Sequence, residues 1–378
     1  MKEAVIVAYQ RSPFHLANKG ALIKVRPDDL AAAVVKSIVD KTKVEPNDIE
    51  DLLMGCAFPE GEQGFNVAKL VGMIAGLPQS VAGATINRFC GSSMQGIHVA
   101  AGAIALGAGD VFICAGIESM TRVPMLGFNP MPNPALNERL PAAYVSMGIT
   151  AENVANKYKI SRAEQEAFAV ESQKKAAAAR AAGKFKDEIV PIVSGKETIT
   201  EDGTIRPDTN AEGLAGLKPA FDAAGSVTAG TSSPLTDGSA ACLVTSLDYA
   251  KSHNLPILAK IRAISVAGCA PEIMGIGPVT ATQRALKRAG LTIDDIDIIE
   301  LNEAFASQSL ACIRDLKIDV KKVNLDGGAI AIGHPLGATG ARITGKAASL
   351  LKREGKKFAL ATQCIGGGQG IATILEAI

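Results

Sequence analysis

The strongest constraint on the fold is a pattern that occurs twice at one spacing. An acidic-then-apolar run around Ile49 is followed by an apolar run that begins near Val111, and a similar pair lies around Ile296 and Phe358. The interval within the first pair equals the interval within the second, so a single offset relates both members of one pair to those of the other. Apolar runs that alternate with helical patterns are typical of α/β proteins with buried parallel strands. The spacing therefore predicts an internal duplication within an α/β fold.

The composition indicates a large aliphatic core and a balanced surface charge. Of the 378 residues 47% are hydrophobic but only 4% are aromatic, so we expect aliphatic and small side chains to fill the interior. The net charge of +1 argues against a basic nucleic-acid-binding face. No apolar run approaches the roughly 18 residues of a membrane-spanning helix, and no leader-like segment precedes the first predicted strand. We therefore expect a cytoplasmic protein.

The seven cysteines are too widely spaced to form a structural zinc site. The chain contains no C-x-x-C motif and no Cys/His cluster, so the sequence predicts free thiols and no metal. Most of these thiols are expected to be small buried side chains, and one or two to be chemically active.

The duplication divides the chain into a first half, residues 1–250, and a second half, residues 251–378. Within the first half, residues from about 119 to 230 have no counterpart in the second. This insertion begins with a Pro-, Met- and Asn-rich stretch, continues with a long helical pattern at 152–182 and ends in Gly- and Pro-containing loops. A long unrepeated segment of this kind predicts a lid or binding loop, with a simple packing excursion as the alternative.

Cys90 lies where an extended run meets an Ala- and Gly-rich helical pattern. A thiol in that place lies at the positive end of a helix dipole, where the thiolate is favoured. The small residues that follow it would let a substrate approach closely. Cys90 is therefore a candidate nucleophile, and a buried cysteine in a tight turn is the alternative.

His334 is one of only four histidines and lies in a glycine-rich segment just before another helical pattern. A single histidine is more often structural than catalytic, but one held on a glycine-rich turn is a good candidate for a general base. The offset between the two halves aligns Cys90 with Gly337, which follows His334 closely. The duplication therefore predicts that both segments meet at one site.

Two further segments carry candidate polar groups. Cys364 is followed by four glycines in five positions, which would free backbone N–H groups to face an anion. The segment lacks the lysine of a phosphate-binding loop, so an oxyanion hole beside a second thiol fits better. Asn302 follows an apolar run and is expected at the carboxyl end of a strand, where α/β proteins place their sites.

Together, these segments resemble the thiolase family. The resemblance rests on Asn-Arg-Phe-Cys-Gly-Ser-Ser-Met-Gln at 87–95, Asn-Glu-Ala-Phe at 302–305, Gly-Gly-Ala-Ile-Ala-Ile-Gly-His-Pro at 327–335 and Cys-Ile-Gly-Gly-Gly-Gln-Gly at 364–370. It covers essentially the whole chain. It implies a thiolase-like α/β fold of two duplicated βαβαβαββ halves, in a layered αβαβα arrangement with an inserted loop domain. It also implies a homodimer or homotetramer.

The resemblance implies a catalytic role for five residues. Cys90 would accept the acyl group, His334 would activate it, and Cys364 would move a proton as general acid or base. Asn302 would hold a water that forms one oxyanion hole with His334, and the amides of Cys90 and Gly366 would form the other. Neither a metal nor a bound cofactor is implied, because coenzyme A is a substrate.

The resemblance also implies a set of positions that contact coenzyme A or the acyl group. They are Arg206 beside the adenine, Phe221, Gly230 and Ser233 along the pantetheine, and Met147, Met274 and Phe305 around the acyl end.

The implied reaction is thiolytic cleavage of 3-ketoacyl-CoA by CoA, which would make the chain an acyltransferase of fatty acid β-oxidation. Ser146-Met147 stands where biosynthetic thiolases have a His-Met pair, and the runs 62–66 and 231–233 are similar to degradative 3-ketoacyl-CoA thiolases. The alternative is an acetyl-CoA acetyltransferase that makes acetoacetyl-CoA. A decarboxylating ketosynthase and a non-catalytic acyl-CoA-binding subunit are more remote, and a hydratase–dehydrogenase is a candidate partner.

Overall fold

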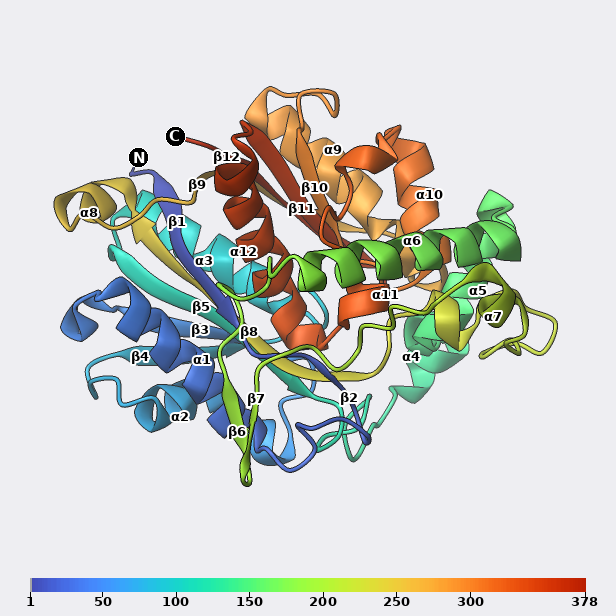
Figure 1. Ribbon diagram of the computed structural model, residues 1–378, viewed down its shortest axis with the longest axis horizontal. Coiled ribbons are helices and arrows are strands. Elements are labelled where there is room, and N and C mark those ends of the chain that lie inside the picture. Colours follow the sequence, from blue (N-terminus) through green and yellow to red (C-terminus); the bar gives the residue numbers. More distant parts are fainter. Residues whose placement is uncertain (1) are drawn as a thin grey trace.

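A computed structural model describes residues 2–378 (Figure 1), in which helices and sheet alternate in five layers. The strands of the first half are β1 (Ala4–Arg11), β3 (Asp51–Gly55), β4 (Ala82–Ile86), β5 (Val111–Ser119) and β8 (Thr236–Ser246). Those of the second half are β9 (Ala259–Gly268), β10 (Ile298–Leu301), β11 (Phe358–Ile365) and β12 (Gln369–Glu376). They form one sheet in the order β10-β11-β12-β9-β1-β8-β5-β3-β4, and short β2 (His15–Leu16) pairs with β8.

The strand register confirms the predicted duplication. Asp51 of β3 pairs with Phe112 of β5, and Ile298 of β10 pairs with Ala359 of β11; both pairs are parallel. The interval from Asp51 to Ile298 equals the interval from Phe112 to Ala359, and both equal the offset displayed by the sequence. The halves join where β1 pairs with β9 over two positions.

One strand of the second half is shortened to a single bridge. The counterpart of β4 is a single parallel bridge between Ile299 and Val323, so the described second half has four strands where the family pattern implies five. The chain before this bridge turns in a 3-10 helix, Val320–Lys322, so pairing at the edge of β10 is confined to Val323 and to Asn324, whose amide donates to the Ile299 carbonyl at 2.8 Å.

Helices occupy the outer and middle layers. Outer helices α1 (Pro27–Thr42) and α2 (Val67–Ile74) cover the first half, and α9 (Gly277–Ala289) and α10 (Ala306–Leu316) cover the second (Figure 1). The middle layer is α3 (Ser92–Leu106) and α12 (Leu336–Glu354), which pack on each other and on strands of both halves. Each of the two sheet regions is thus covered by helices on both faces.

Small residues allow the middle helices to approach closely. Fifteen of the 19 residues of α12 are buried, which leaves it no solvent-facing stripe. A Cβ at Gly340 would lie 2.3 Å from the backbone nitrogen of Met94 in α3, and one at Gly345 would lie 2.3 Å from the Tyr9 ring. The predicted aliphatic and small-residue core is therefore required by the distance between these layers.

The expectation about membrane-spanning segments was wrong in one respect. Residues 89–106 are long and apolar enough, by length and composition alone, to cross a membrane. Half of this stretch is buried inside the fold, where Met94 and Ile97 of α3 belong to the central core. A core helix that packs between two regions of a sheet produces the same composition as a membrane span.

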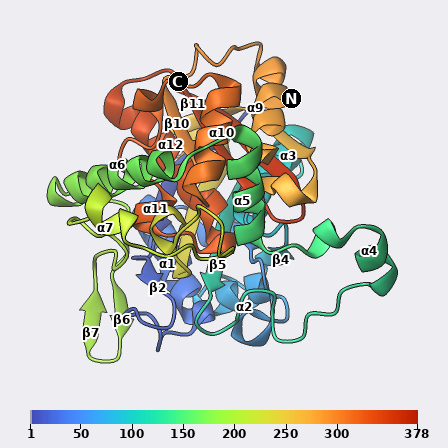
Figure 2. The same ribbon diagram turned by 90° about the vertical axis from the view of Figure 1, so that its right-hand side faces the viewer.

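The insertion forms a loop domain with short elements. It includes α4 (Pro134–Arg139) on an arm that projects from the body (Figure 2), followed by α5 (Met147–Tyr158), α6 (Arg162–Ala181), the hairpin β6 (Ile192–Ser194) and β7 (Glu197–Ile199), and α7 (Ala211–Ala215). The predicted single helix at 152–182 is two helices. Lys159 ends α5 with φ of 53°, and Ser161 begins α6 in a reciprocal cap with Glu164.

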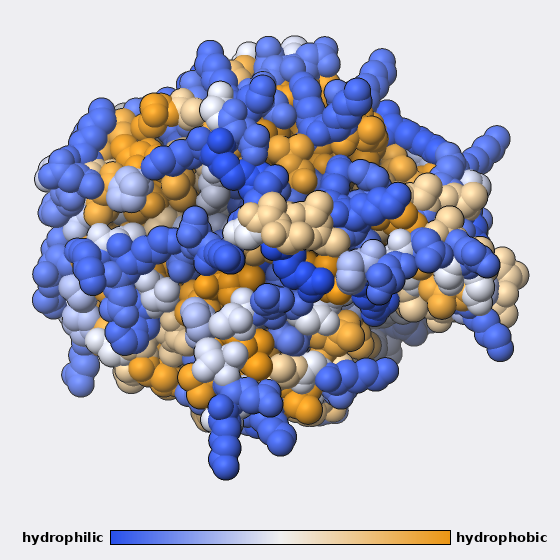
Figure 3. Space-filling model, viewed as in Figure 1, coloured by the Kyte–Doolittle hydropathy of each residue, from blue (hydrophilic) through white to orange (hydrophobic). Residues whose placement is uncertain are grey.

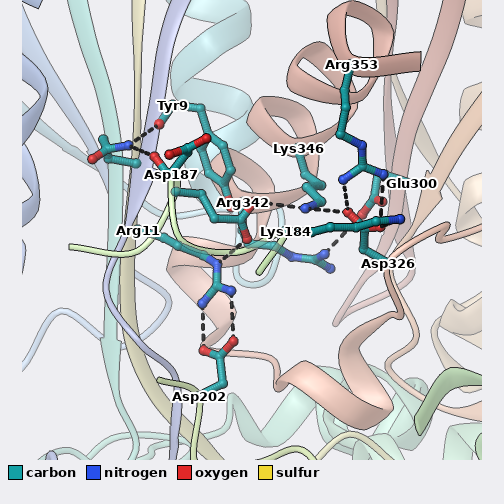
Figure 4. A network of polar contacts seen from close by, with 12 residues as sticks. Tyr9, Arg11, Lys184, Asp187, Asp202, Glu300, Asp326, Arg342, Lys346 and Arg353 are labelled. Carbon is teal, nitrogen blue, oxygen red and sulfur yellow. Dashed lines mark hydrogen bonds and ion pairs between the residues drawn. The ribbon is translucent and has the colours of Figure 1, made fainter. Parts of the chain in front are cut away.

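Buried ion pairs attach the insertion to both halves (Figure 4). Arg11 of β1 bonds Glu188 at 2.8 Å and Asp202 at 2.6 Å, both from the insertion. Lys346 of α12 bonds the same Glu188 at 2.9 Å and Asp326 at 2.8 Å. By contrast, polar and charged residues are spread over the outer face, with smaller apolar areas between them (Figure 3).

Candidate active site

A strained turn presents Cys90 just before α3. Phe89 has φ of 42°, in the left-handed region that a bulky side chain rarely adopts. Two side chains hold it there: Asn87 Oδ1 accepts from the Phe89 amide at 2.8 Å, and Ser92 Oγ accepts from the Arg88 amide at 2.9 Å and donates to the Phe89 carbonyl. A strained backbone of this kind persists only where surrounding hydrogen bonds and packing hold it in place.

The thiolate of Cys90 is disfavoured in this site, contrary to the expectation from the helix dipole. The pKa of Cys90 is raised to about 11: burial is the main cause and the charge of Glu118 adds to it, whereas the N–H groups of Gly366 and of Cys90 itself lower the pKa. Desolvation outweighs the dipole and both amides. Cys90 is therefore a thiol at neutral pH and would need a base in order to act as a nucleophile.

His334 lies between the short helix α11 (Ala329–Ile332) and α12. Gly333 precedes it with φ of 107°, and a Cβ there would lie 2.7 Å from Thr236, so only glycine fits. The His334 amide donates to Thr236 Oγ1 at 3.1 Å, and ring Nδ1 lies 2.6 Å from Thr339 Oγ1. Burial lowers the pKa of His334 to about 3. The ring is thus a neutral, fixed imidazole at physiological pH.

Asn302 follows β10 and lies against the His334 ring. Its amide nitrogen donates to the Thr362 carbonyl at 3.0 Å, which fixes the backbone at the end of the strand. Side-chain Nδ2 is 3.4 Å from Nε2 and 3.5 Å from Nδ1 of His334. Within residues 2–378, the buried Oδ1 of Asn302 has no hydrogen-bond partner. The side chain therefore has an acceptor available beside the imidazole.

Cys364 brings a second thiol to the site from β11. Burial is the main cause that raises its pKa well above the ordinary value, and the neighbouring Cys90 raises the pKa further. Cys364 is therefore protonated at neutral pH and can donate a proton. Gly366, two residues later, directs its N–H at the Cys90 sulfur, and the Gln363 side chain donates to the Cys90 carbonyl. Gln363 was not anticipated from the sequence.

One apolar pocket of about 200 Å³ collects most of the predicted residues. It is lined by the predicted Cys90, Met147, Phe221, Ser233, Met274, Phe305, His334 and Cys364. Residues that the sequence did not single out also line it, among them Met120, Met125, Pro234, Leu235 and Leu336. The Phe221 and Phe305 rings meet edge to face at 5.9 Å and form part of its wall.

Two predicted CoA contacts do not lie in this pocket. Arg206 is exposed, with its backbone amide bonded to Gln173 Oε1 at 2.8 Å. Gly230 lies in a 3-10 turn, where an added Cβ would be 2.5 Å from Leu214. Both belong to the insertion, and neither is among the residues that line this pocket.

A second apolar pocket of about 220 Å³ shares residues with the first. Cys90, Met125, Met147 and Leu336 line both. The remaining wall of the second pocket consists of Phe58, Phe89, Leu126, Pro130, Pro132, Ala143, Tyr144, Val145, Gly366 and Gly367. Most of these come from the Pro- and Met-rich start of the insertion, whose composition was the only sequence signal for this pocket.

Comparisons with known proteins agree with this geometry. Residues 4–248 match the protein family described as "Thiolase, N-terminal domain", and residues 255–377 match the family described as "Thiolase, C-terminal domain". The chain belongs to the thiolase family. A 3-ketoacyl-CoA thiolase of Bacillus subtilis (strain 168) is 49% identical over 392 aligned residues, with 100% of each chain covered. A 3-ketoacyl-CoA thiolase of Idiomarina loihiensis is 48% identical over 391, again with 100% of each covered.

Solved thiolase structures share the fold. The crystal structure of human mitochondrial 3-ketoacyl-CoA thiolase is 40% identical, with a TM-score of 0.92, and the match covers 100% of this chain and 99% of that one. The same enzyme in complex with CoA matches with equal TM-score and identity and 98% of its chain covered. The family and the layered thiolase fold predicted from the motifs are therefore confirmed. Across residues 2–378 of this thiolase, no group of three His, Cys, Asp or Glu side chains is placed to hold a metal ion.

Proposed function

We propose that this thiolase cleaves 3-ketoacyl-CoA with CoA, giving acetyl-CoA and a shortened acyl-CoA through an acyl-enzyme on Cys90. The convergence of a neutral imidazole, two protonated thiols and two backbone N–H groups on one apolar pocket carries this proposal. Cleavage of a carbon–carbon bond requires a covalent acceptor, a proton donor and separate stabilisation of two oxyanions.

In the first half-reaction, His334 takes the proton of Cys90 as the sulfur attacks the 3-keto carbon. With Nδ1 donating to Thr339 Oγ1, Nε2 is the free base. The N–H groups of Cys90 and Gly366 stabilise the alkoxide that forms. The bond between the substrate's second and third carbons then breaks, and the departing acetyl-CoA enolate takes a proton from Cys364.

In the second half-reaction, CoA replaces acetyl-CoA and its thiol gives a proton back to Cys364. The CoA sulfur attacks the acyl group, and the Cys90 sulfur leaves and recovers its proton from His334. Asn302, beside His334, stabilises the enolate oxygen of the first half-reaction through a water or directly. Every step uses side chains and substrates, so the proposal includes no bound cofactor.

The second pocket supports an acyl chain longer than that of acetoacetyl-CoA, and therefore a degradative role in β-oxidation. It opens beside Cys90 and has an almost wholly apolar wall, which suits an alkyl tail attached to that sulfur. An enzyme limited to acetoacetyl-CoA would have no use for this volume. A ketosynthase reaction is disfavoured, because His334 is the single histidine among the lining residues of both pockets within residues 2–378.

The test is CoA-dependent loss of the enolate absorbance of acetoacetyl-CoA and of a 3-ketoacyl-CoA of eight to twelve carbons, measured in parallel. We expect a higher kcat/KM for the longer substrate. A strict preference for acetoacetyl-CoA would instead establish the acetyl-CoA acetyltransferase alternative. Cleavage of neither substrate would leave the binding-subunit alternative in its place.

We also infer that the chain assembles with copies of itself. Among the described strands, β4 ends the sheet and pairs with another strand, β3, on one side only. On its other edge the Gly83 carbonyl accepts from Asn66 Nδ2, and no further strand within residues 2–378 covers that edge. The neighbouring α3 exposes Leu106 and Val99, and the projecting arm exposes Met131 and Phe128. Light scattering on the eluting peak should give twice or four times 39.0 kDa, and a mass of one chain would refute the inference.

A further inference from the structure

Glu118 of β5 is a buried carboxylate that none of the proposed steps uses. It is 1% exposed, and within residues 2–378 no Lys, Arg or His lies within ion-pairing distance of it. One oxygen accepts from the amides of Ala57 at 2.8 Å and Gly337 at 2.9 Å. The other accepts from the amide of Phe58 at 3.3 Å and from Gln63 Nε2 at 3.0 Å.

These partners show that Glu118 is ionised. All four are N–H groups, which donate and do not accept, and the Cys56 thiol at 3.8 Å is a further donor. A proton on the carboxyl would therefore have no strong acceptor among its neighbours. Burial raises the pKa of Glu118, and the four N–H bonds oppose that rise. A buried charge without a counter-ion is costly, and its presence beside the reacting groups calls for an explanation.

The same contacts join the two halves at the active site. Gly337 is the second residue of α12 and lies three positions after His334, whereas Ala57 and Phe58 follow β3 in the first half. A Cβ at Gly337 would lie 2.7 Å from both Cys56 Cα and the Ile117 carbonyl, so this end of α12 is enclosed as well as bonded. Glu118 thus fixes the helix end that carries His334 against the half that carries Cys90.

The charge also acts on Cys90. The 19-residue helix α12 directs its positive end at the site, and Glu118 bonds an amide of its first turn. The Glu118 charge is one of the causes that raise the pKa of Cys90. The carboxylate therefore opposes the stabilising effect of this helix dipole on a Cys90 thiolate and acts in the same direction as burial.

We propose that Glu118 is a positioning residue for the proposed reaction: it holds the His334 end of α12 in register with Cys90, and its charge adds to the burial that keeps Cys90 a thiol. Protonated Cys90 resists alkylation and oxidation while the site is open. When a substrate enters, His334 takes the proton, so the nucleophile forms only in the presence of its target. The role in turnover rests on the proposed function, whereas the effect on Cys90 does not.

Glu303 provides a matched control. It is also buried, at 2% exposure, and touches the His334 segment from the other side. Its carboxylate accepts from Ser172 Oγ at 2.6 Å, Asn324 Nδ2 at 2.7 Å and the Ile330 amide at 3.2 Å. Its charge is not among the causes that shift the pKa of Cys90. Replacing either glutamate removes one buried charge, but only one of these charges acts on the nucleophile.

The experiment compares the wild-type chain with Glu118→Gln and Glu303→Gln. The rate of iodoacetamide alkylation at Cys90 is followed from pH 6 to 11, with the modified residue identified by mass spectrometry. We expect the alkylation midpoint of Glu118→Gln to fall by about one pH unit, which is about tenfold faster modification below the midpoint, and that of Glu303→Gln to stay at the wild-type value. An unchanged or higher midpoint in Glu118→Gln, or an equal fall in both variants, would overturn the proposal.

A third variant, Glu118→Asp, separates the effect of the Glu118 charge from the effect of its hydrogen bonds to α12. It also keeps the test decisive if Glu118→Gln fails to fold. Glu118→Asp keeps the charge but cannot reach all of its partners, so we expect a tenfold or greater fall in kcat at a wild-type alkylation midpoint. Full kcat in Glu118→Asp would refute the positioning role. If the wild-type chain cleaves no 3-ketoacyl-CoA, the proposed function fails, and the alkylation midpoints still decide whether Glu118 controls Cys90.

Discussion

Replacing Lys346 with methionine tests whether the buried ion pairs hold α12 in place. Lys346 Nζ lies 2.9 Å from Glu188 and 2.8 Å from Asp326, and its side chain is 4% exposed (Figure 4). Methionine preserves much of the side-chain volume but leaves both carboxylates with one cation fewer. Removing one partner of a buried pair typically costs about 3–5 kcal/mol, because the other charge remains buried.

The pKa of Asp326 gives an independent measure of the stability that Lys346 contributes. Burial raises this pKa, but bonds to Arg353 and the charge of Lys346 outweigh burial and lower the pKa of Asp326 to about 2. Against an ordinary value of about 3.9, this shift corresponds to about 2.5 kcal/mol of stability at neutral pH, which Lys346 shares with Arg353. Burial also raises the pKa of Glu188, and Lys346 and Arg11 together lower it by more, so Lys346 stabilises two carboxylates. We therefore expect a total loss of about 3 kcal/mol.

The pH dependence follows from the sign of these shifts. In the wild-type chain the lowered pKa values contribute stability above the ordinary carboxyl pKa, and this stability is lost as the pH falls towards 2. In Lys346→Met the pKa of Glu188 rises, because burial is no longer fully opposed. Protonation of Glu188 then favours the folded variant. The difference in free energy of unfolding between wild type and variant should therefore shrink as the pH falls from 7 to 5.

The measurement is urea unfolding followed by circular dichroism at both pH values, with Lys36→Met as the control. Lys36 pairs with Asp40 at 2.7 Å on the surface, with both side chains more than half exposed, and its loss should cost less than about 1 kcal/mol. Two results would refute the reasoning: a loss of unfolding free energy below about 1 kcal/mol in Lys346→Met, or a difference from wild type that is larger at pH 5 than at pH 7.

Three predictions concern activity. Cys90→Ser should bind CoA but lose at least about a thousandfold in kcat, because a hydroxyl is a poorer nucleophile and leaving group here, and retention of thiolysis would contradict the assignment. Because the pKa of His334 is lowered to about 3, kcat/KM should show no acid limb near pH 6.5, and such a limb would show that His334 titrates as an exposed histidine. Ala143→Trp should fill the second pocket and slow a ten-carbon substrate about tenfold or more relative to acetoacetyl-CoA, whereas equal slowing of both would place the acyl chain elsewhere.

Local patterns were sufficient to predict much of the layered fold. The offset between the two halves recurs in the register of β3 with β5 and of β10 with β11, because strand spacing is set by the length of the βα units between them. The break between α5 and α6 was also encoded, since Ser161 and Glu164 form a capping pair that the sequence displays. The prediction of one long helix is wrong because the amphipathic pattern continues across a cap that begins a new helix.

The electrostatics of the site could not be predicted in the same way. The position of Cys90 before α3 was correct, but the dipole argument favoured a thiolate, and burial reverses that outcome. Burial of a side chain depends on what packs over it, and here that cover includes β11 and the insertion, which lie far away in the sequence. Glu118 carried no local signal, because it belongs to no motif that the sequence displays, and the run 62–66 pointed to a subtype without giving Gln63 a role.

The sequence by itself determined the duplicated α/β architecture, the family and the segments that carry Cys90, His334, Asn302 and Cys364. Strand spacing, glycine turns and motif order are local properties, and they need no knowledge of which segments meet. Only the tertiary structure decided that His334 is a buried, neutral imidazole, that a second apolar pocket opens beside Cys90, and that Glu118 bonds α12 from the opposite half. These features depend on desolvation and on contacts between segments that lie far apart in the sequence, and a linear pattern does not encode them.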